Sequence, residues 1–166
     1  MICISLSPPY ATLIAIGAKR IETRGWSTSL RGPLAIHQTA APGPKGTTEA
    51  ALWDRCLSEP FRAALLAAGY GNPARLPRGK IVAVVEPRLV IRVEILESYG
   101  DHDLFTLTDQ ERAFGDYAPG RYAWLLSNVC ALAEPLPARG MPGLWRADAQ
   151  AERAVLAQLE GRVAVC

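Results

Sequence analysis

Apolar and polar residues alternate over short stretches of this chain, a pattern typical of β-strands. In the segment Lys19–Arg24, a predicted strand places Arg20, Glu22 and Arg24 on one face, and Ile21 and Thr23 on the other. Apolar runs predict further strands at residues 34–37, 80–85, 89–93, 121–127 and 132–137. Pro87 lies between two of these runs and indicates an edge, a bulge or a bend, because proline cannot donate a ladder hydrogen bond.

Capping residues and breakers predict the helices between these strands. A short apolar helix follows Ser7 as its cap, has Pro8 at its first position and ends at Gly17, which suits a left-handed conformation. Thr47 or Thr48 caps a second helical stretch over 49–69, which Pro60 divides into two helices. One helical turn is expected over 108–114, and Asp148 caps a last helix over 149–161.

Five or six short strands in hairpin-compatible order, with helices between them, predict an α+β fold. We expect a small mixed sheet or partly closed β-barrel with peripheral helices. The βαβ units and glycine-rich first turn of a dinucleotide-binding fold are missing.

Composition narrows the function classes without choosing one. The 166 residues suit one domain, and 18 basic against 16 acidic residues leave a net charge of only +2, too small to indicate nucleic acid. We find no membrane-spanning run and no secretory signal, so a cytoplasmic location with reduced cysteines is expected. The cysteines and two histidines show no metal-binding spacing, so no metal or cofactor is predicted.

Charged and aromatic residues concentrate in residues 17–26. Lys19 offers a compact cation, and Arg24 and Arg31 offer planar guanidinium groups that suit phosphate. Glu22 offers a hydrogen-bond acceptor. The alternative is a solvated edge strand in which Glu22 pairs with a neighbouring arginine.

Three segments in order, residues 5–11, 17–26 and 31–37, carry the serine-led opening, the G-x-K-x-x-E-x-R-x-W motif and an R-G-x-L-x-I strand. Together with residues 119–124 and 140–145 they resemble the ASCH domain family of the PUA-like superfamily. The resemblance covers residues 1–146, including an inserted helical segment 47–70. Residues 147–166 then form a C-terminal helix that packs on the barrel or on a partner.

The resemblance implies a pseudo-barrel whose cleft is lined by the segment that contains Lys19, Glu22 and Arg24. It implies binding of RNA or a nucleotide-like ligand and no membrane. The candidate binding residues are Tyr10, Lys19, Arg24, Trp26, Arg31 and Arg121. Pro8 and Tyr10 replace the family's glutamine and tryptophan, and Tyr10 can still stack on a base. Trp26, Trp124 and Trp145 have an alternative role, as packing at the ends of strands.

The alternative function is a hydrolase acting on RNA or on N4-acylated cytidine. One branch of the family hydrolyses such cytidines with a lysine, a threonine and a glutamate. Lys19 aligns with that lysine, Glu22 occupies the threonine position, and Glu111 is a candidate for the remote glutamate. Lys19 and Glu22 are therefore the candidate catalytic residues. A neighbouring carboxylate favours the charged ammonium, which favours binding over hydrolysis. A third alternative is a protein-interaction module with an apolar cleft.

Overall fold

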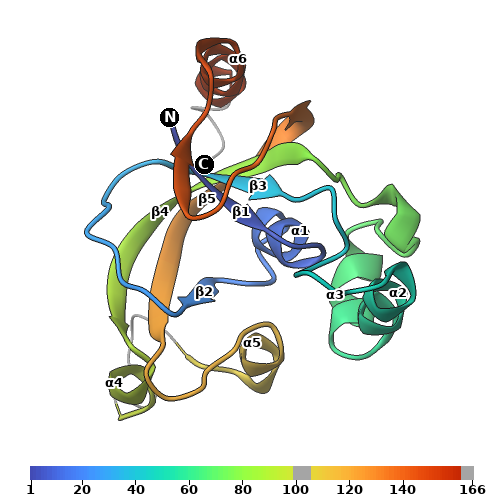
Figure 1. The fold of residues 1–166 in the computed structure, drawn as a ribbon, viewed down its shortest axis with the longest axis vertical. Coiled ribbons are helices and arrows are strands. Elements are labelled where there is room, and N and C mark those ends of the chain that lie inside the picture. Colours follow the sequence, from blue (N-terminus) through green and yellow to red (C-terminus); the bar gives the residue numbers. More distant parts are fainter. Residues whose placement is uncertain (99–105, 162–166) are drawn as a thin grey trace.

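A six-stranded mixed sheet forms the centre of the molecule in the computed structural model, which describes residues 1–98 and 106–161 (Figure 1). The strand order is β2-β5-β4-β3-β1-β6. The strands are β1 (Ile2–Leu6), β2 (Ile21–Arg24), β3 (Leu34–Gln38), β4 (Lys80–Arg92), β5 (Tyr122–Pro137) and β6 (Leu144–Arg146). The helices are α1 (Tyr10–Ala15), α2 (Glu49–Leu57), α3 (Phe61–Ala67), the 3-10 turn η1 (Pro73–Arg75), α4 (Val93–Ser98), α5 (Asp109–Ala113) and α6 (Ala149–Glu160).

Long antiparallel pairing between β4 and β5 dominates the sheet, while β1 and β3 pair in parallel. The register of the β4–β5 pair shifts on both sides of Glu86 and Pro87, so of the alternatives predicted at Pro87 the bulge is confirmed, and the edge is wrong because β4 lies between β5 and β3. The two predicted runs of β4 are one strand, because these shifts absorb the proline without ending the ladder. The predicted strands 121–127 and 132–137 are likewise the two halves of β5.

In the described part of the chain the sheet is open and does not close into a barrel, so of the two expected forms the mixed sheet is confirmed. Among the described residues, β2 and β6 are the two edges of the strand order and do not pair with each other. β2 has four residues and β6 has three, so neither offers an edge long enough to close the sheet. The α+β class and the peripheral helices are confirmed.

Helix α1 packs against the sheet with Ala11 and Ile14, and against α2 and α3 with Leu13. It begins at Tyr10 after Pro9, and no side chain caps it, so the predicted Ser7 cap is wrong. Pro8 and Pro9 have no backbone N–H, so they cannot donate the hydrogen bonds that a capping serine side chain would accept. Gly17 has φ +76°, so the predicted left-handed end of this helix is confirmed.

Local signals for the other helices are also confirmed. The Thr48 side chain accepts a hydrogen bond from the Ala51 N–H at 3.1 Å and starts α2, and Pro60 separates α2 from α3. The Asp148 carboxylate accepts from the Ala151 N–H at 2.8 Å and starts α6.

Helix α6 packs on the sheet through Val155, which is fully buried in one cluster with Leu132 and Trp145. Leu156, which the pattern places on the same apolar side, is exposed. Residues 162–166 of the predicted C-terminal segment lie outside the described residues. In the described part of the chain, no helix combines the length and apolarity needed to cross a bilayer.

Candidate functional site

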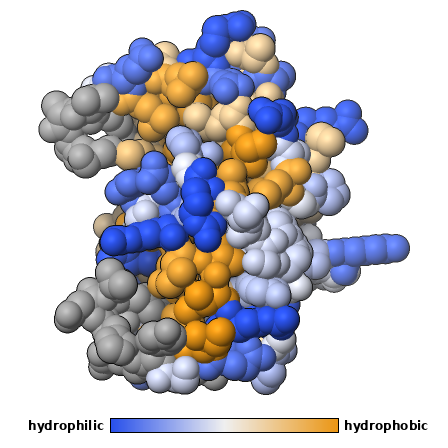
Figure 2. Space-filling view, turned by 90° about the vertical axis from the view of Figure 1, so that its left-hand side faces the viewer, coloured by the Kyte–Doolittle hydropathy of each residue, from blue (hydrophilic) through white to orange (hydrophobic). Residues whose placement is uncertain are grey.

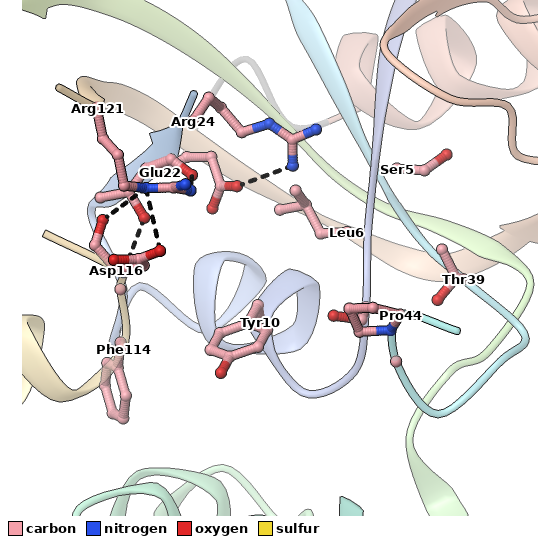
Figure 3. A pocket seen from close by; sticks show the side chains of 14 residues that line it. Ser5, Leu6, Tyr10, Glu22, Arg24, Thr39, Pro44, Phe114, Asp116 and Arg121 are labelled. Carbon is pink, nitrogen blue, oxygen red and sulfur yellow. Dashed lines mark hydrogen bonds and ion pairs between the residues drawn. The ribbon is translucent and has the colours of Figure 1, made fainter. Parts of the chain in front are cut away.

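A pocket of about 470 Å³ opens between α1, β2 and the segment that precedes β5 (Figure 3). We call it the Tyr10 lobe. Its lining residues come from four distant parts of the chain: Ser5, Leu6, Ser7, Tyr10, Glu22, Thr23, Arg24, Thr39, Gly43, Pro44, Phe114, Gly115, Asp116 and Arg121.

Two ion pairs shape the polar wall of the Tyr10 lobe. Nη1 of Arg24 lies 3.5 Å from Oε1 of Glu22, and Nε of Arg121 lies 3.3 Å from Oδ2 of Asp116. Glu22 and Arg24 both line the lobe, and Glu22 is only 8% exposed. β2 is an edge strand and Glu22 pairs with Arg24, as the alternative interpretation expects, but the strand is not solvated, because α5 and the segment after it cover it.

Lys19 lies beneath this wall and is not among the lining residues. Its side chain is 1% exposed, and its ammonium donates to the carbonyl oxygens of Ile21 and, at 2.8 Å, Phe114. Nζ is also 3.7 Å from Oε2 of Glu22 and 4.0 Å from Oε1 of Glu111. The buried ammonium thus joins β2 to α5, and both its neighbouring carboxylates balance its charge.

Glu111 completes this buried charge cluster of Lys19, Glu22 and Glu111. Its carboxylate accepts hydrogen bonds from the N–H groups of Arg20 at 2.9 Å and Ile21 at 3.1 Å. Burial raises its pKa, while the Lys19 charge and the two backbone hydrogen bonds oppose that rise. The structure thus brings the sequence candidates Lys19, Glu22 and Glu111 together, with Glu22 alone of the three lining the lobe.

Of the other candidate binding residues, Tyr10, Arg24 and Arg121 line the Tyr10 lobe, whereas Trp26 and Arg31 do not. Trp26 packs edge-to-face on the fully buried Trp124, with ring centroids 4.8 Å apart. Trp26 and Trp124 therefore have the alternative role that the sequence predicts for them, packing at the ends of strands. Arg31 is exposed and donates to the carbonyl of Leu30.

Sequence reasoning missed several lining residues, among them Ser5, Thr39, Phe114 and Asp116. Asp116 follows an aromatic residue and a glycine, which is a weak signal for a loop that approaches a ligand. Ser5 belongs to the serine-led opening of the family motif, whereas Thr39 carries no signal of its own, and both enter the lobe through the pairing of β1 with β3.

A second hollow of about 580 Å³ adjoins the first and shares Ser5, Arg24 and Thr39 with it. We call it the Arg139 lobe, and the two lobes together the groove. Its remaining lining residues are mostly small: His37, Ala40, Ala41, Gly79, Ala138, Arg139, Gly140, Met141, Pro142 and Gly143.

Neutral hydrogen bonds build the wall of the Arg139 lobe. Nε2 of His37 donates to the carbonyl oxygen of Ala138 at 3.1 Å, since a carbonyl can only accept, and Nδ1 then accepts from Oγ of Ser5 at 3.1 Å. Trp145 donates its indole N–H to the same Oγ at 3.0 Å. Burial lowers the pKa of His37, which favours the neutral ring. Gly140 passes directly over this group, where a Cβ would lie 2.6 Å from Nδ1 and 2.7 Å from Oγ.

Outside the groove, exposed apolar side chains form patches on the surface. Figure 2 shows one side of the molecule, on which apolar patches are interrupted by polar residues. Leu89 on β4 and Ile95 on α4 belong to the exposed large apolar residues, at 40% and 44% exposure. Polar residues interrupt these apolar patches (Figure 2), whereas charged and aromatic side chains converge on the groove.

The chain is similar in sequence to known proteins. The chain is 26% identical over 149 residues to activating signal cointegrator 1 of Homo sapiens, and 25% identical to that of Mus musculus. These matches cover 89% of this chain and 22% of each relative, so the chain spans about a fifth of their length. ASCH from Zymomonas mobilis aligns at a TM-score of 0.49 and 15% identity, over 94% of this chain and 93% of that one.

A family model assigns the chain. The ASCH domain model matches residues 4–136, which include β2 to β4, most of β1 and β5, and every residue that lines the Tyr10 lobe. The chain therefore belongs to the ASCH domain family.

Proposed function

We propose that the groove binds single-stranded RNA, with a base in the Tyr10 lobe. One observation carries this proposal: an aromatic ring, two arginines and two carboxylates converge on a single pocket (Figure 3). Tyr10 supplies a ring for stacking, and Arg24 and Arg121 supply cations for the backbone. This combination of π-surface and positive charge is typical of sites that take single-stranded nucleic acid.

The two carboxylates give the lobe a basis for choosing among bases. Glu22 and Asp116 can accept hydrogen bonds, and carboxylates pair with the exocyclic amino group of cytosine. Uracil lacks an amino group. We therefore expect a cytidine- or adenosine-rich strand to bind more tightly than oligouridine.

The environment of Lys19 supports binding over hydrolysis. Its ammonium donates to two carbonyl oxygens, lies within 4.0 Å of two carboxylates and does not line the lobe. A nucleophile must reach the reacting carbonyl carbon in the pocket, and the buried Nζ of Lys19, held by these partners, does not. Within this proposal Lys19 is a positioning residue that holds Glu22 at the wall.

Fluorescence anisotropy with a labelled ten-nucleotide RNA, across a salt series, tests the proposal. We expect weak binding whose affinity falls with salt, with a log–log slope of about −1.4 for two phosphate contacts on a single strand. Tyr10→Ala lowers the affinity about tenfold by removing the stacking ring. Tyr10→Phe is the matched control and retains it. Undetectable binding, or binding that salt does not change, contradicts the proposal.

The buried charge cluster favours one second candidate, hydrolysis of an N4-acylated cytidine. Glu22 lines the lobe and would take a proton from the attacking water and give it to the departing cytosine amino group, while Lys19 and Glu111 lie directly behind it. Incubation with N4-acetylcytidine should then release cytidine and acetate, and Glu22→Gln should abolish release while circular dichroism reports an intact fold. Absence of product from the wild-type protein rejects this candidate.

We also propose that the protein is located in the cytoplasm. Cys3 and Cys56 are buried free thiols, and burial raises the pKa of each to about 11. Thiols of this kind suit a reducing compartment.

A further inference from the structure

The two lobes of the groove differ in charge. The Tyr10 lobe has a balanced lining, in which Arg24 and Arg121 face Glu22 and Asp116. The Arg139 lobe is lined by Arg24 and Arg139, and no aspartate or glutamate is present among its described lining residues. An anionic group entering the groove is therefore favoured in the Arg139 lobe, and groups that donate hydrogen bonds are favoured in the other.

Arg24 lies at the junction of the lobes. In Figure 3, Glu22, Asp116 and Arg121 lie at one end of the Tyr10 lobe, with Ser5 and Thr39 at the other end and Arg24 between them. Nη1 of Arg24 lies 3.5 Å from Oε1 of Glu22, and a guanidinium carries five N–H donors. Arg24 is 27% exposed in its side chain, so it can hold Glu22 and a ligand oxygen together.

Arg139 supplies the second cation, and the residues around it leave room. It is exposed on the segment between β5 and β6, and its lobe is lined by Ala40, Gly79, Gly143 and other small residues. His37 adds no positive charge near neutral pH, because it is buried and its Nδ1 accepts from Ser5. Recognition of an anion in this lobe therefore depends on the two arginines.

We propose that the Arg139 lobe holds the phosphate of the nucleotide whose base occupies the Tyr10 lobe. The ligand class is then a phosphorylated nucleotide or a phosphodiester strand, and a free nucleoside uses only half of the groove. This inference rests on the proposed function, since it needs a base in the Tyr10 lobe. Guanidinium groups suit it because they bind phosphate oxygens in a paired, charge-assisted geometry.

Titrations followed by NMR chemical shifts test the phosphate site with four ligands: cytidine, its 3′-monophosphate, its 5′-monophosphate and the dinucleotide CpC. We expect at least one phosphorylated ligand to bind about tenfold more tightly than cytidine. Arg139→Gln should remove most of that gain and leave cytidine affinity unchanged. Arg88→Gln is the matched control, since Arg88 lines a hollow that shares no residue with the groove.

The outcomes separate the two proposals. If none of the four ligands binds, the base site of the proposed function fails. If cytidine binds and phosphate brings no gain, or if Arg139→Gln leaves the gain intact, the phosphate site is overturned while the base site stands. Tighter binding of CpC than of either monophosphate supports an internal phosphodiester, and the reverse order supports a free nucleotide, so both orders support a phosphate site.

Discussion

Buried polar groups beneath the two ends of the groove are stabilised by opposite chemistry. At the β2 end, Lys19, Glu22 and Glu111 form a cluster of charges, with Lys19 1% exposed. At the β1–β3–β6 end, Ser5, His37 and Trp145 form neutral hydrogen bonds, with His37 2% exposed.

A buried charge must keep its partners, because an unpaired charge in a low dielectric is costly. A neutral network costs less free energy to bury. Little space surrounds this one, so an added side-chain atom would displace its groups. We therefore expect the β2 end to be sensitive to changes in charge and the β1 end to be sensitive to changes in volume.

The largest effect should come from Lys19→Met, which removes the cation and leaves two buried carboxylates and two carbonyl oxygens without it. We expect a loss of about 3 to 5 kcal/mol in the free energy of unfolding, measured by urea denaturation. Lys45→Met, at an exposed position in the loop before α2, is the control and should change little. A loss below about 1 kcal/mol for Lys19→Met would mean that the cluster does not depend on its cation.

Gly140→Ala tests the volume limit at the other end. Its Cβ would lie 2.6 Å from Nδ1 of His37 and 2.7 Å from Oγ of Ser5, so the network must move. Overpacking of this kind costs about 1 to 3 kcal/mol in urea denaturation. Gly25→Ala is the matched control, because nothing lies within 4 Å of its Cβ. Equal stability of the two variants would show that the network yields without cost.

Opposite pH dependences should distinguish the ends, with a smaller effect than either substitution. Burial lowers the pKa of His37 below 6.5, so its contribution is complete above pH 6.5 and is lost as the pH falls through the folded value. Burial raises the pKa of Glu111 above 4.5, so its contribution is complete below pH 4.5 and is lost as the pH rises.

Urea denaturation of His37→Gln and Glu111→Gln, measured from pH 4 to pH 8, checks both signs. Relative to wild type, each variant should lose the pH dependence that its residue supplies. If the stability of the two variants changes with pH in the same way, the two ends do not differ in their titration.

The smallest effect should come from Arg31→Gln, because this arginine is exposed and lies outside the groove. Its RNA affinity should stay within about twofold of wild type, whereas Arg24→Gln should lower it about tenfold in the same anisotropy assay. Equal losses for both variants would mean that RNA contacts a surface wider than the groove.

Local signals in the sequence predicted most element boundaries. Gly17, Thr48, Pro60 and Asp148 act through their own backbone neighbours, so their effects can be read without knowing the fold. The break predicted within β5 is wrong, because the continuation of this strand depends on residues that are distant in the sequence. The strand continues because β4 pairs with both of its halves, and this partner lies far away in the sequence.

The sequence alone determined the alternation of Glu22 with Thr23 and Arg24, the family motifs and the α+β class, because these depend on spacing along the chain. Only the tertiary structure decided the role of each charge. Lys19 is buried because Phe114 and Glu111, more than ninety residues away, surround it. Arg24 belongs to two lobes because β1, β3 and the segment before β6 converge on it. A side chain's chemistry depends on its partners and its burial, and the spacing of residues along the chain specifies neither.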